Sequence, residues 1–138
     1  MSAHLKEKEE KILQILGQLA EETEKGTPII VEGKRDIETL KVLNVEGKII
    51  SAKTGGKTLL DTISELEKTQ TQKVILLLDF DRRGKELTKN LVKHLERMGI
   101  EVNLQFWREL LGLVGKELKD VEGLATYIET LKKKISNS

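Results

Sequence analysis

Cysteine is absent from the sequence, which excludes disulfide bonds, thiolate metal sites and a cysteine nucleophile. Long apolar stretches are also missing, and none approaches the roughly 18 residues that a membrane-spanning helix needs. The first residues, MSAHLKEKEEK, are polar and unlike a secretion signal. We therefore expect a cytoplasmic protein that makes no membrane contact.

Neither sign of charge is in clear excess, since 24 Lys and Arg residues face 23 Asp and Glu residues. A net charge of +1 excludes a global attractive field for a polyanion, so any contact with nucleic acid must use a local basic patch. The 138 residues are enough for one domain with its own hydrophobic core.

The most informative stretch is KVILLLDFDRRG, residues 73–84, in which a purely apolar run ends at two aspartates. An apolar run without alternation, residues 74–78, is typical of a strand that is covered on both faces in a parallel sheet. Asp79 and Asp81 follow at its carboxyl end, two residues apart and therefore pointing the same way. Two such carboxylates suit a shared divalent cation. An alternative stays open, in which Asp79 caps the next helix and Asp81 lies in a solvated turn.

A second acid follows another short apolar run, in the segment PIIVEGKRD, residues 28–36. Here residues 29–31 form a β-branched strand that ends at Glu32. In open α/β sheets the ligand site lies outside the carboxyl ends of the strands. If the two strands are neighbours, Glu32, Asp79 and Asp81 meet there.

These residues resemble the signature of the Toprim family, a glutamate that closes a first strand and a later Asp-x-Asp with glycine three residues on. The matching residues are Glu32 and Gly33, then Asp79, Asp81 and Gly84. The segment VEGKRD is most similar to small stand-alone Toprim proteins, particularly archaeal ones, and to a ribosomal-RNA maturase. The resemblance spans residues 27–131. It implies an α/β fold with about four largely parallel strands and helices on both faces.

The resemblance divides the chain into an accessory helix, residues 1–25, and a Toprim domain with C-terminal helices, residues 26–138. It also implies a site in which Glu32, Asp79 and Asp81 are the catalytic and metal-binding residues. The ion is Mg²⁺, with Mn²⁺ as the alternative, because hard cations prefer oxygen ligands. Glu32 is the general acid or base or an indirect metal contact, while Asp79 and Asp81 hold the metal.

Basic residues surround the proposed acids and predict a surface for DNA or RNA. The set comprises Lys34, Arg35, Lys57, Arg82, Arg83 and Lys85. Topoisomerases of the family carry further acids where Arg83 and Lys85 stand here. The site is therefore less acidic than theirs, and Tyr127, the sole tyrosine, lies on an apolar helix face where it is expected in the core.

Two functions stay open at this point. The first is a small Mg²⁺-dependent nuclease or RNA- or DNA-processing phosphoryl-transfer enzyme. The second is a non-catalytic nucleic-acid-binding or scaffold subunit of a larger complex. A nucleotide-hydrolysing P-loop is disfavoured, because AKTGGKT has Ser51 where the Walker pattern requires its first glycine. A phosphate-binding turn at Gly55 and Gly56 remains an alternative to a plain loop.

Three further features carry open alternatives. A helix at residues 6–24 has an apolar stripe that either packs on the sheet or forms a homodimer seam, made of Leu5, Ile12, Leu16 and Leu19. Asp120 and Glu122 precede a helix and either cap it or, for Asp120, approach the metal site. The remaining apolar periods predict helices at residues 36–43, 59–67 and 85–98, short strands at 48–51 and 100–104, and two C-terminal helices.

Overall fold

The computed structural model describes residues 2–137. It contains a four-stranded sheet in the order β2-β1-β3-β4, in which every pairing is parallel. The expected α/β fold is confirmed, and the sheet is entirely parallel. The elements along the chain are α1 (Ser2–Glu24), β1 (Ile29–Val31), α2 (Lys34–Val42), β2 (Ile49–Ser51), η1 (Thr54–Gly56), α3 (Leu59–Glu67), β3 (Lys73–Leu76), α4 (Arg82–Arg97), β4 (Glu101–Asn103), α5 (Gln105–Val114) and α6 (Leu124–Ser136).

The two acid-bearing strands are neighbours at the centre of the sheet. Ile29 pairs with Ile75 and Ile30 with Leu76, so β1 and β3 run side by side in the same direction. Their carboxyl ends therefore open at one edge of the sheet, as the convergence of Glu32 with Asp79 and Asp81 requires.

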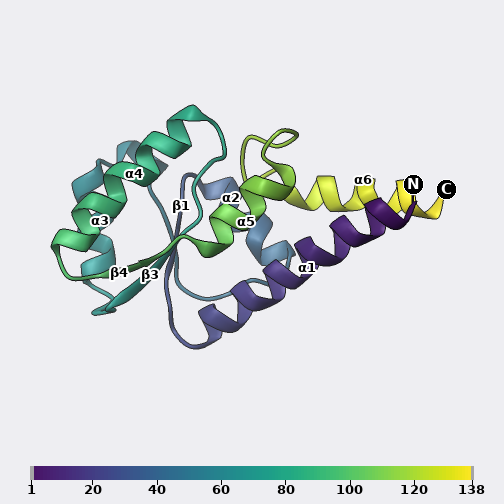
Figure 1. The fold of residues 1–138 in the computed structure, drawn as a ribbon. Coiled ribbons are helices and arrows are strands. Elements are labelled where there is room, and N and C mark those ends of the chain that lie inside the picture. Colours follow the sequence, from purple (N-terminus) through teal and green to yellow (C-terminus); the bar gives the residue numbers. More distant parts are fainter. Residues whose placement is uncertain (1, 138) are drawn as a thin grey trace.

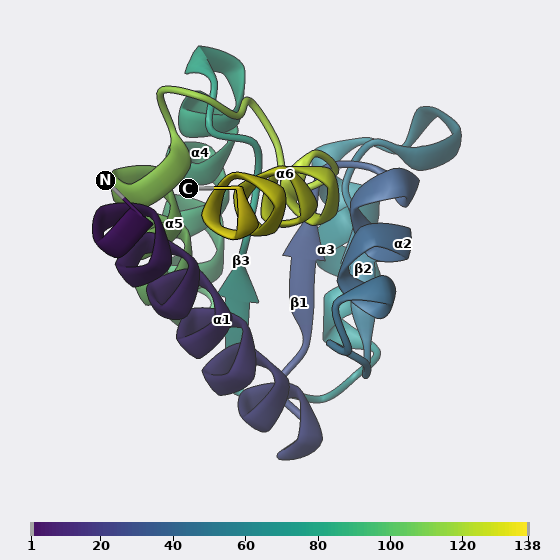
Figure 2. The same cartoon turned by 90° about the vertical axis from the view of Figure 1, so that its right-hand side faces the viewer.

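Alternating strand residues divide the core into two layers, one on each face of the sheet. Ile29, Val31 and Ile75 belong to a layer that includes residues of α1, α2, α5 and α6. Ile30, Val74 and Leu76 belong to the opposite layer, with residues of α3 and α4. Helices therefore cover both faces, as Figures 1 and 2 show.

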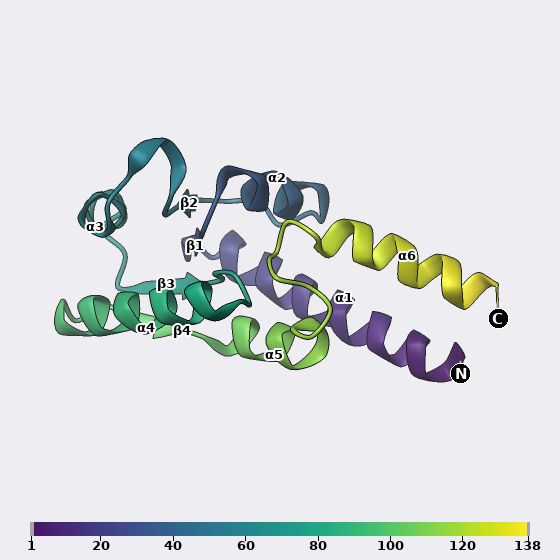
Figure 3. The ribbon, with the colours of Figure 1, turned by 90° about the horizontal axis from the view of Figure 1, so that it is seen from above.

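The N-terminal helix is longer than its predicted extent and is part of the first layer. Ile12, Leu16 and Leu19 are buried, and Leu5 packs against the same cluster. α1 lies along α5 and α6, and α1 and α6 run side by side beyond the sheet (Figures 1 and 3). The stripe considered as a dimer seam is thus covered within the chain.

The predicted elements agree with the structure except near their ends. The predicted central strand extended to Leu78, whereas the ladder of β3 ends at Leu76, and Leu77 and Leu78 stay fully buried beyond it. α4 begins at Arg82, three residues earlier than predicted, because Asp81 caps it. Among residues 2–137, none of the helices has both the length and the apolar composition of a membrane-spanning segment.

Candidate metal centre

Asp81 is both the second aspartate of the proposed site and the N-cap residue of α4. Its Oδ1 accepts a hydrogen bond from the backbone N–H of Gly84 at 2.8 Å and caps α4. The alternative in which Asp79 is the cap is therefore wrong, since Asp81 has this function. The cap uses only Oδ1 of Asp81. Because a monodentate metal contact needs one oxygen, the same carboxylate can cap α4 and bind a metal ion.

The turn from β3 into α4 is held closely by its neighbours. A Cβ atom added at Gly84 would lie 2.1 Å from the backbone oxygen of Asp79, so only glycine fits there. Phe80 is buried between the two aspartates, and its N–H donates to the carbonyl of Lys119 at 2.6 Å. The indole N–H of Trp107 donates to the carbonyl of Leu78 at 3.0 Å. These contacts fix the orientation of both aspartates.

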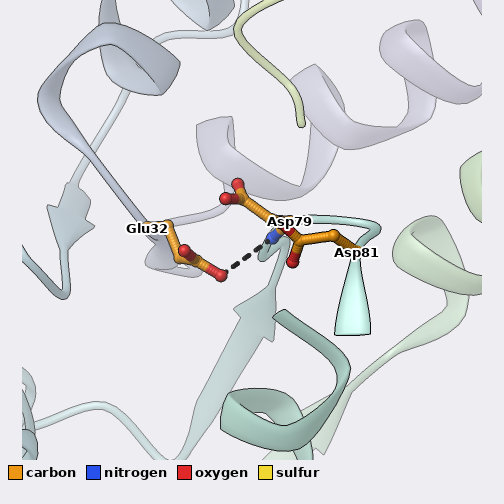
Figure 4. A group of neighbouring side chains, drawn as sticks. All are labelled: Glu32, Asp79 and Asp81. Carbon is orange, nitrogen blue, oxygen red and sulfur yellow. Dashed lines mark hydrogen bonds between the residues drawn. The ribbon is translucent and has the colours of Figure 1, made fainter. Parts of the chain in front are cut away.

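Glu32 reaches from the end of β1 to the turn that carries the aspartates (Figure 4). It is 6% exposed, and its Oε1 accepts a hydrogen bond from the backbone N–H of Asp79 at 3.3 Å. Its Oε2 lies 3.1 Å from Nζ of Lys53. The buried carboxylate thus has a partner at each oxygen, as a buried charge requires.

Like charges crowd the site and shift its titration. Burial, followed by hydrogen bonding and repulsion from Glu32, raises the pKa of Asp79 from 3.8 to about 8. Burial also raises the pKa of Asp36, against the lowering effect of hydrogen bonds from the backbone of Gly33 and Glu122. A cation at this position would relieve the repulsion and favour the ionised carboxylates.

The donor set fits a hard divalent cation. One carboxylate oxygen from each of Glu32, Asp79 and Asp81 lies within 4.8 Å of the other two. Opposite ligands of an octahedral Mg²⁺ are about 4.2 Å apart, because each Mg–O bond is about 2.1 Å. Small side-chain movements or an intervening water accommodate the difference, and Mg²⁺ usually keeps several waters.

A cavity of about 180 Å³ lies beside Glu32 and Asp79. Its lining includes three residues that were not predicted as site residues, namely Gly33, Asp36 and Lys53, together with Asp120 and Glu122. Asp120 Oδ1 accepts from the N–H of Gly123 at 3.0 Å, and Asp120 also lines the cavity. Gly123 is itself the N-cap of α6, and that helix start has no side-chain cap hydrogen bond, so the predicted capping by Asp120 and Glu122 is not found. The approach of Asp120 to a bound metal stays a prediction.

Asp36 is the most informative residue that sequence reasoning missed. The sequence predicts Asp36 only as the first residue of a helix, yet it is 5% exposed and accepts hydrogen bonds from the N–H of Gly33 and of Glu122. The pattern VEGKRD gave a signal, because an acid three residues after Gly33 matches the acidic position of a capping box. No local sequence pattern predicts the hydrogen bond from Glu122, because the two residues are 86 positions apart.

Five of the six predicted basic residues lie together at the edge that carries the acids. Lys34 and Arg35 begin α2, whereas Arg82, Arg83 and Lys85 begin α4, and all five are exposed. Arg35 pairs with Glu122 at 3.4 Å and Arg82 with Glu86 at 3.6 Å. Exposed pairs of this kind are weak and leave the side chains free to contact phosphate.

Lys57 does not share this environment. Its ammonium group donates to the carbonyl of Ser51 at 2.8 Å and pairs with Glu65. Thr58 and Asp61 form a capping box at the start of α3, so the first turn of that helix already has side-chain partners. Tyr127 packs against the first layer beside Lys8, whose Nζ lies 5.6 Å from the ring centre.

Comparisons with known proteins agree with this geometry. The Toprim domain family matches residues 27–105. A UPF0292 protein of Methanocaldococcus jannaschii is 42% identical over 120 residues, which cover 86% of this chain and 91% of that protein. A UPF0292 protein of Methanosarcina acetivorans is 39% identical over 125 residues, which cover 91% of this chain and 85% of that protein.

A solved structure of a protein from Aquifex aeolicus has the same fold. It superposes with a TM-score of 0.65 and 27% identity, over 79% of this chain and 94% of that one. The Toprim match includes Glu32, Asp79, Asp81 and Gly84, the residues on which the resemblance rested. The chain therefore belongs to the Toprim family, within the group of small UPF0292 proteins that its archaeal relatives represent.

Proposed function

We propose that the protein is a small Mg²⁺-dependent nuclease that hydrolyses phosphodiester bonds in DNA or RNA. The observation that carries the proposal is the grouping of Glu32, Asp79 and Asp81, with one oxygen of each within 4.8 Å of the others. Mn²⁺ fits the same oxygen ligands. Toprim domains are found in proteins that act on nucleic acid. Exposed Lys and Arg residues at the starts of α2 and α4 lie next to this site.

Each residue has a defined task in this proposal. Asp79 and Asp81 hold the ion, which when bound supplies charge stabilisation for the transferring phosphoryl group. Glu32 accepts or donates the proton of the attacking or leaving oxygen, and Nζ of Lys53 lies 3.1 Å from its Oε2. Arg82 and Arg83 bind the phosphodiester that flanks the scissile bond.

The test combines metal titration with cleavage assays. Calorimetry should show binding of Mg²⁺ or Mn²⁺ that is lost in the Asp79→Asn/Asp81→Asn double variant. Labelled DNA and RNA should be cut by the intact protein and not by this variant, while ATP should not be hydrolysed. Glu96→Gln/Glu129→Gln is the matched control, because it changes the charge equally at two exposed positions, one on α4 and one on α6. Unchanged metal affinity in the aspartate variant would reject the proposal.

A non-catalytic subunit is the second candidate. Arg83 and Lys85 stand where family members with topoisomerase activity carry acids, and Lys53 already pairs with Glu32. Such a subunit would bind metal and nucleic acid and leave both strands intact with either ion. The same cleavage assay distinguishes the two functions.

A homodimer is a further part of this proposal. It would give two linked sites and hence higher affinity for a long polynucleotide. Because α1 buries its stripe within the chain, the dimer would need a different surface. Light scattering at tens of micromolar measures the mass directly, and a monomer mass rejects this part.

A further inference from the structure

The outer face of α4 concentrates the positive charge of the protein. α4 contains six Lys and Arg residues and two Glu residues, a net charge of +4. The rest of the chain then holds 18 basic and 21 acidic residues, a net charge of −3. This helix is therefore a local basic surface in an otherwise slightly acidic protein.

The bases on α4 form a stripe opposite its buried face. Gly84, Thr88, Leu91 and Leu95 face the core, while Arg82, Lys89, Lys93 and Arg97 are all exposed. At 100° per residue around the helix axis, these four basic residues fall within an arc of about 80°. Within the described residues, the one ion pair of this helix joins Arg82 to Glu86.

The stripe begins at the candidate metal centre. Asp81 is the N-cap of α4, so Arg82 adjoins the site and the other basic residues of the stripe follow at increasing distance from it. With a rise of 1.5 Å per residue, Lys89, Lys93 and Arg97 lie roughly 10, 16 and 22 Å along the helix from Arg82. A strand of duplex DNA has one phosphate about every 3.4 Å, so this length spans about six or seven phosphates. α4 lies on the outside of the fold, where a long polymer has access (Figure 3).

We propose that Arg82, Lys89, Lys93 and Arg97 form a track that binds the phosphate backbone of the nucleic acid as it leaves the metal centre. This inference rests on the proposed function and adds a binding surface and a direction to it. The ligand is a polynucleotide backbone, recognised by charge and spacing and not by base sequence. An oligonucleotide too short to extend past Arg82 gains no affinity from Lys89, Lys93 and Arg97.

The test uses the full chain with EDTA, so that no phosphodiester is cut. Fluorescence anisotropy would measure the affinity for 30-nucleotide single-stranded DNA, duplex DNA and RNA between 50 and 200 mM salt. The track variant is Lys89→Gln/Lys93→Gln/Arg97→Gln. Its matched control is Lys132→Gln/Lys133→Gln/Lys134→Gln, which removes the same charge from exposed positions of α6. Circular dichroism checks that both variants are folded.

The track variant should bind about tenfold more weakly at low salt. Its slope of log affinity against log salt should fall by roughly 2 for single strands and 2.7 for duplex DNA, at 0.7 to 0.9 per lost phosphate contact. The α6 variant should keep the slope of the intact protein, and a four-nucleotide probe should bind equally to all three. The three long probes identify which polymer the track prefers.

Equal losses in the two variants would reject the track, because net charge alone would then explain the effect. If the track variant binds as the intact protein does while Asp79→Asn/Asp81→Asn abolishes metal binding, the track is wrong and the proposed metal centre stands. If the intact protein binds none of the three long probes at 50 mM salt, both the track and the nucleic-acid function fail.

Discussion

The carboxylate of Asp36 accepts a hydrogen bond from the backbone N–H of Glu122 at 2.8 Å, across 86 residues of chain. Its second oxygen accepts from the N–H of Gly33 at 2.9 Å. One buried side chain thus joins the turn after Glu32 to the loop that carries Asp120. The same loop is joined to the other acidic turn, since Lys119 accepts from the N–H of Phe80.

Replacing Asp36 should therefore weaken the fold and loosen the site together. Asp36→Ala leaves two N–H groups without acceptors, which we expect to cost about 2–4 kcal/mol of unfolding free energy. Asp36→Asn keeps one acceptor and should cost less. Urea unfolding measures both, with the exposed Glu38→Gln on the same helix as control. A loss of stability in Glu38→Gln equal to that in Asp36→Ala would contradict this explanation.

The raised pKa of Asp79 predicts how the stability of the metal-free protein depends on pH. A carboxyl group whose folded pKa is raised to about 8 stabilises the fold fully below its unfolded value of 3.8, and this contribution is lost as pH rises through about 8. We expect the melting temperature in EDTA to fall between pH 5 and pH 9. Asp79→Asn should be the more stable protein at pH 9, by about 1–2 kcal/mol after allowance for solvent screening. Parallel pH curves for the two proteins would contradict the assignment.

The same pKa couples metal binding to proton release. At pH 7 the metal-free Asp79 is largely protonated, and a bound cation requires its ionised form. Binding of one ion should release close to one proton, and the metal affinity should increase with pH up to about 8. Calorimetry in two buffers of different ionisation enthalpy measures the released protons. A heat that is independent of the buffer would show that Asp79 is already ionised.

Gly84 should tolerate no side chain. A Cβ atom there would lie 2.1 Å from the backbone oxygen of Asp79, so Gly84→Ala forces the acidic turn to move. We expect a loss of about 2–4 kcal/mol, together with weaker metal binding. Gly112→Ala in α5 is the matched control, because no atom lies within 4 Å of its added Cβ, and it should be neutral or slightly stabilising. Equal stability of the two variants would show that the turn is less constrained than its geometry indicates.

The place of α1 in the core can be measured with one pair of variants. Leu19 is fully buried, so Leu19→Ala should cost about 2–5 kcal/mol of unfolding free energy. Leu13, on the same helix, is 42% exposed, and Leu13→Ala should cost less than about 1 kcal/mol. If residues 1–25 are an accessory that the rest of the fold does not need, both substitutions will have little effect on unfolding of the domain.

The sequence predicted the parts of this protein that depend on local periodicity. The apolar runs before Glu32 and Asp79 predicted the two central strands, and the acids at their ends predicted the acidic cluster, because the geometry of parallel sheets brings such ends together. The boundary at Asp81 was missed by three residues, since Arg82, Arg83 and Gly84 lack the apolar spacing from which the helix was recognised.

Contacts between distant segments were beyond the reach of periodicity. Lys53 comes to Glu32 only when β1 and β2 pair, and Asp36 reaches Glu122 only when α6 docks near α2. The neighbours of Lys57 in the sequence place it in the predicted basic surface, whereas in the structure it forms an ion pair with Glu65 of α3. Each of these outcomes depends on tertiary packing and not on a local pattern.

Trp107 gives the protein an optical reporter of its own site. It is the sole tryptophan in the sequence, it is 8% exposed, and its indole N–H donates to the carbonyl of Leu78, which directly precedes Asp79. Excitation selective for tryptophan therefore reports on Trp107 alone. This residue is hydrogen-bonded to the segment that carries Asp79 and Asp81. A change in emission on adding Mg²⁺ would record events at the site without a label, and the return of that emission during refolding would time the closing of α5 onto the end of β3.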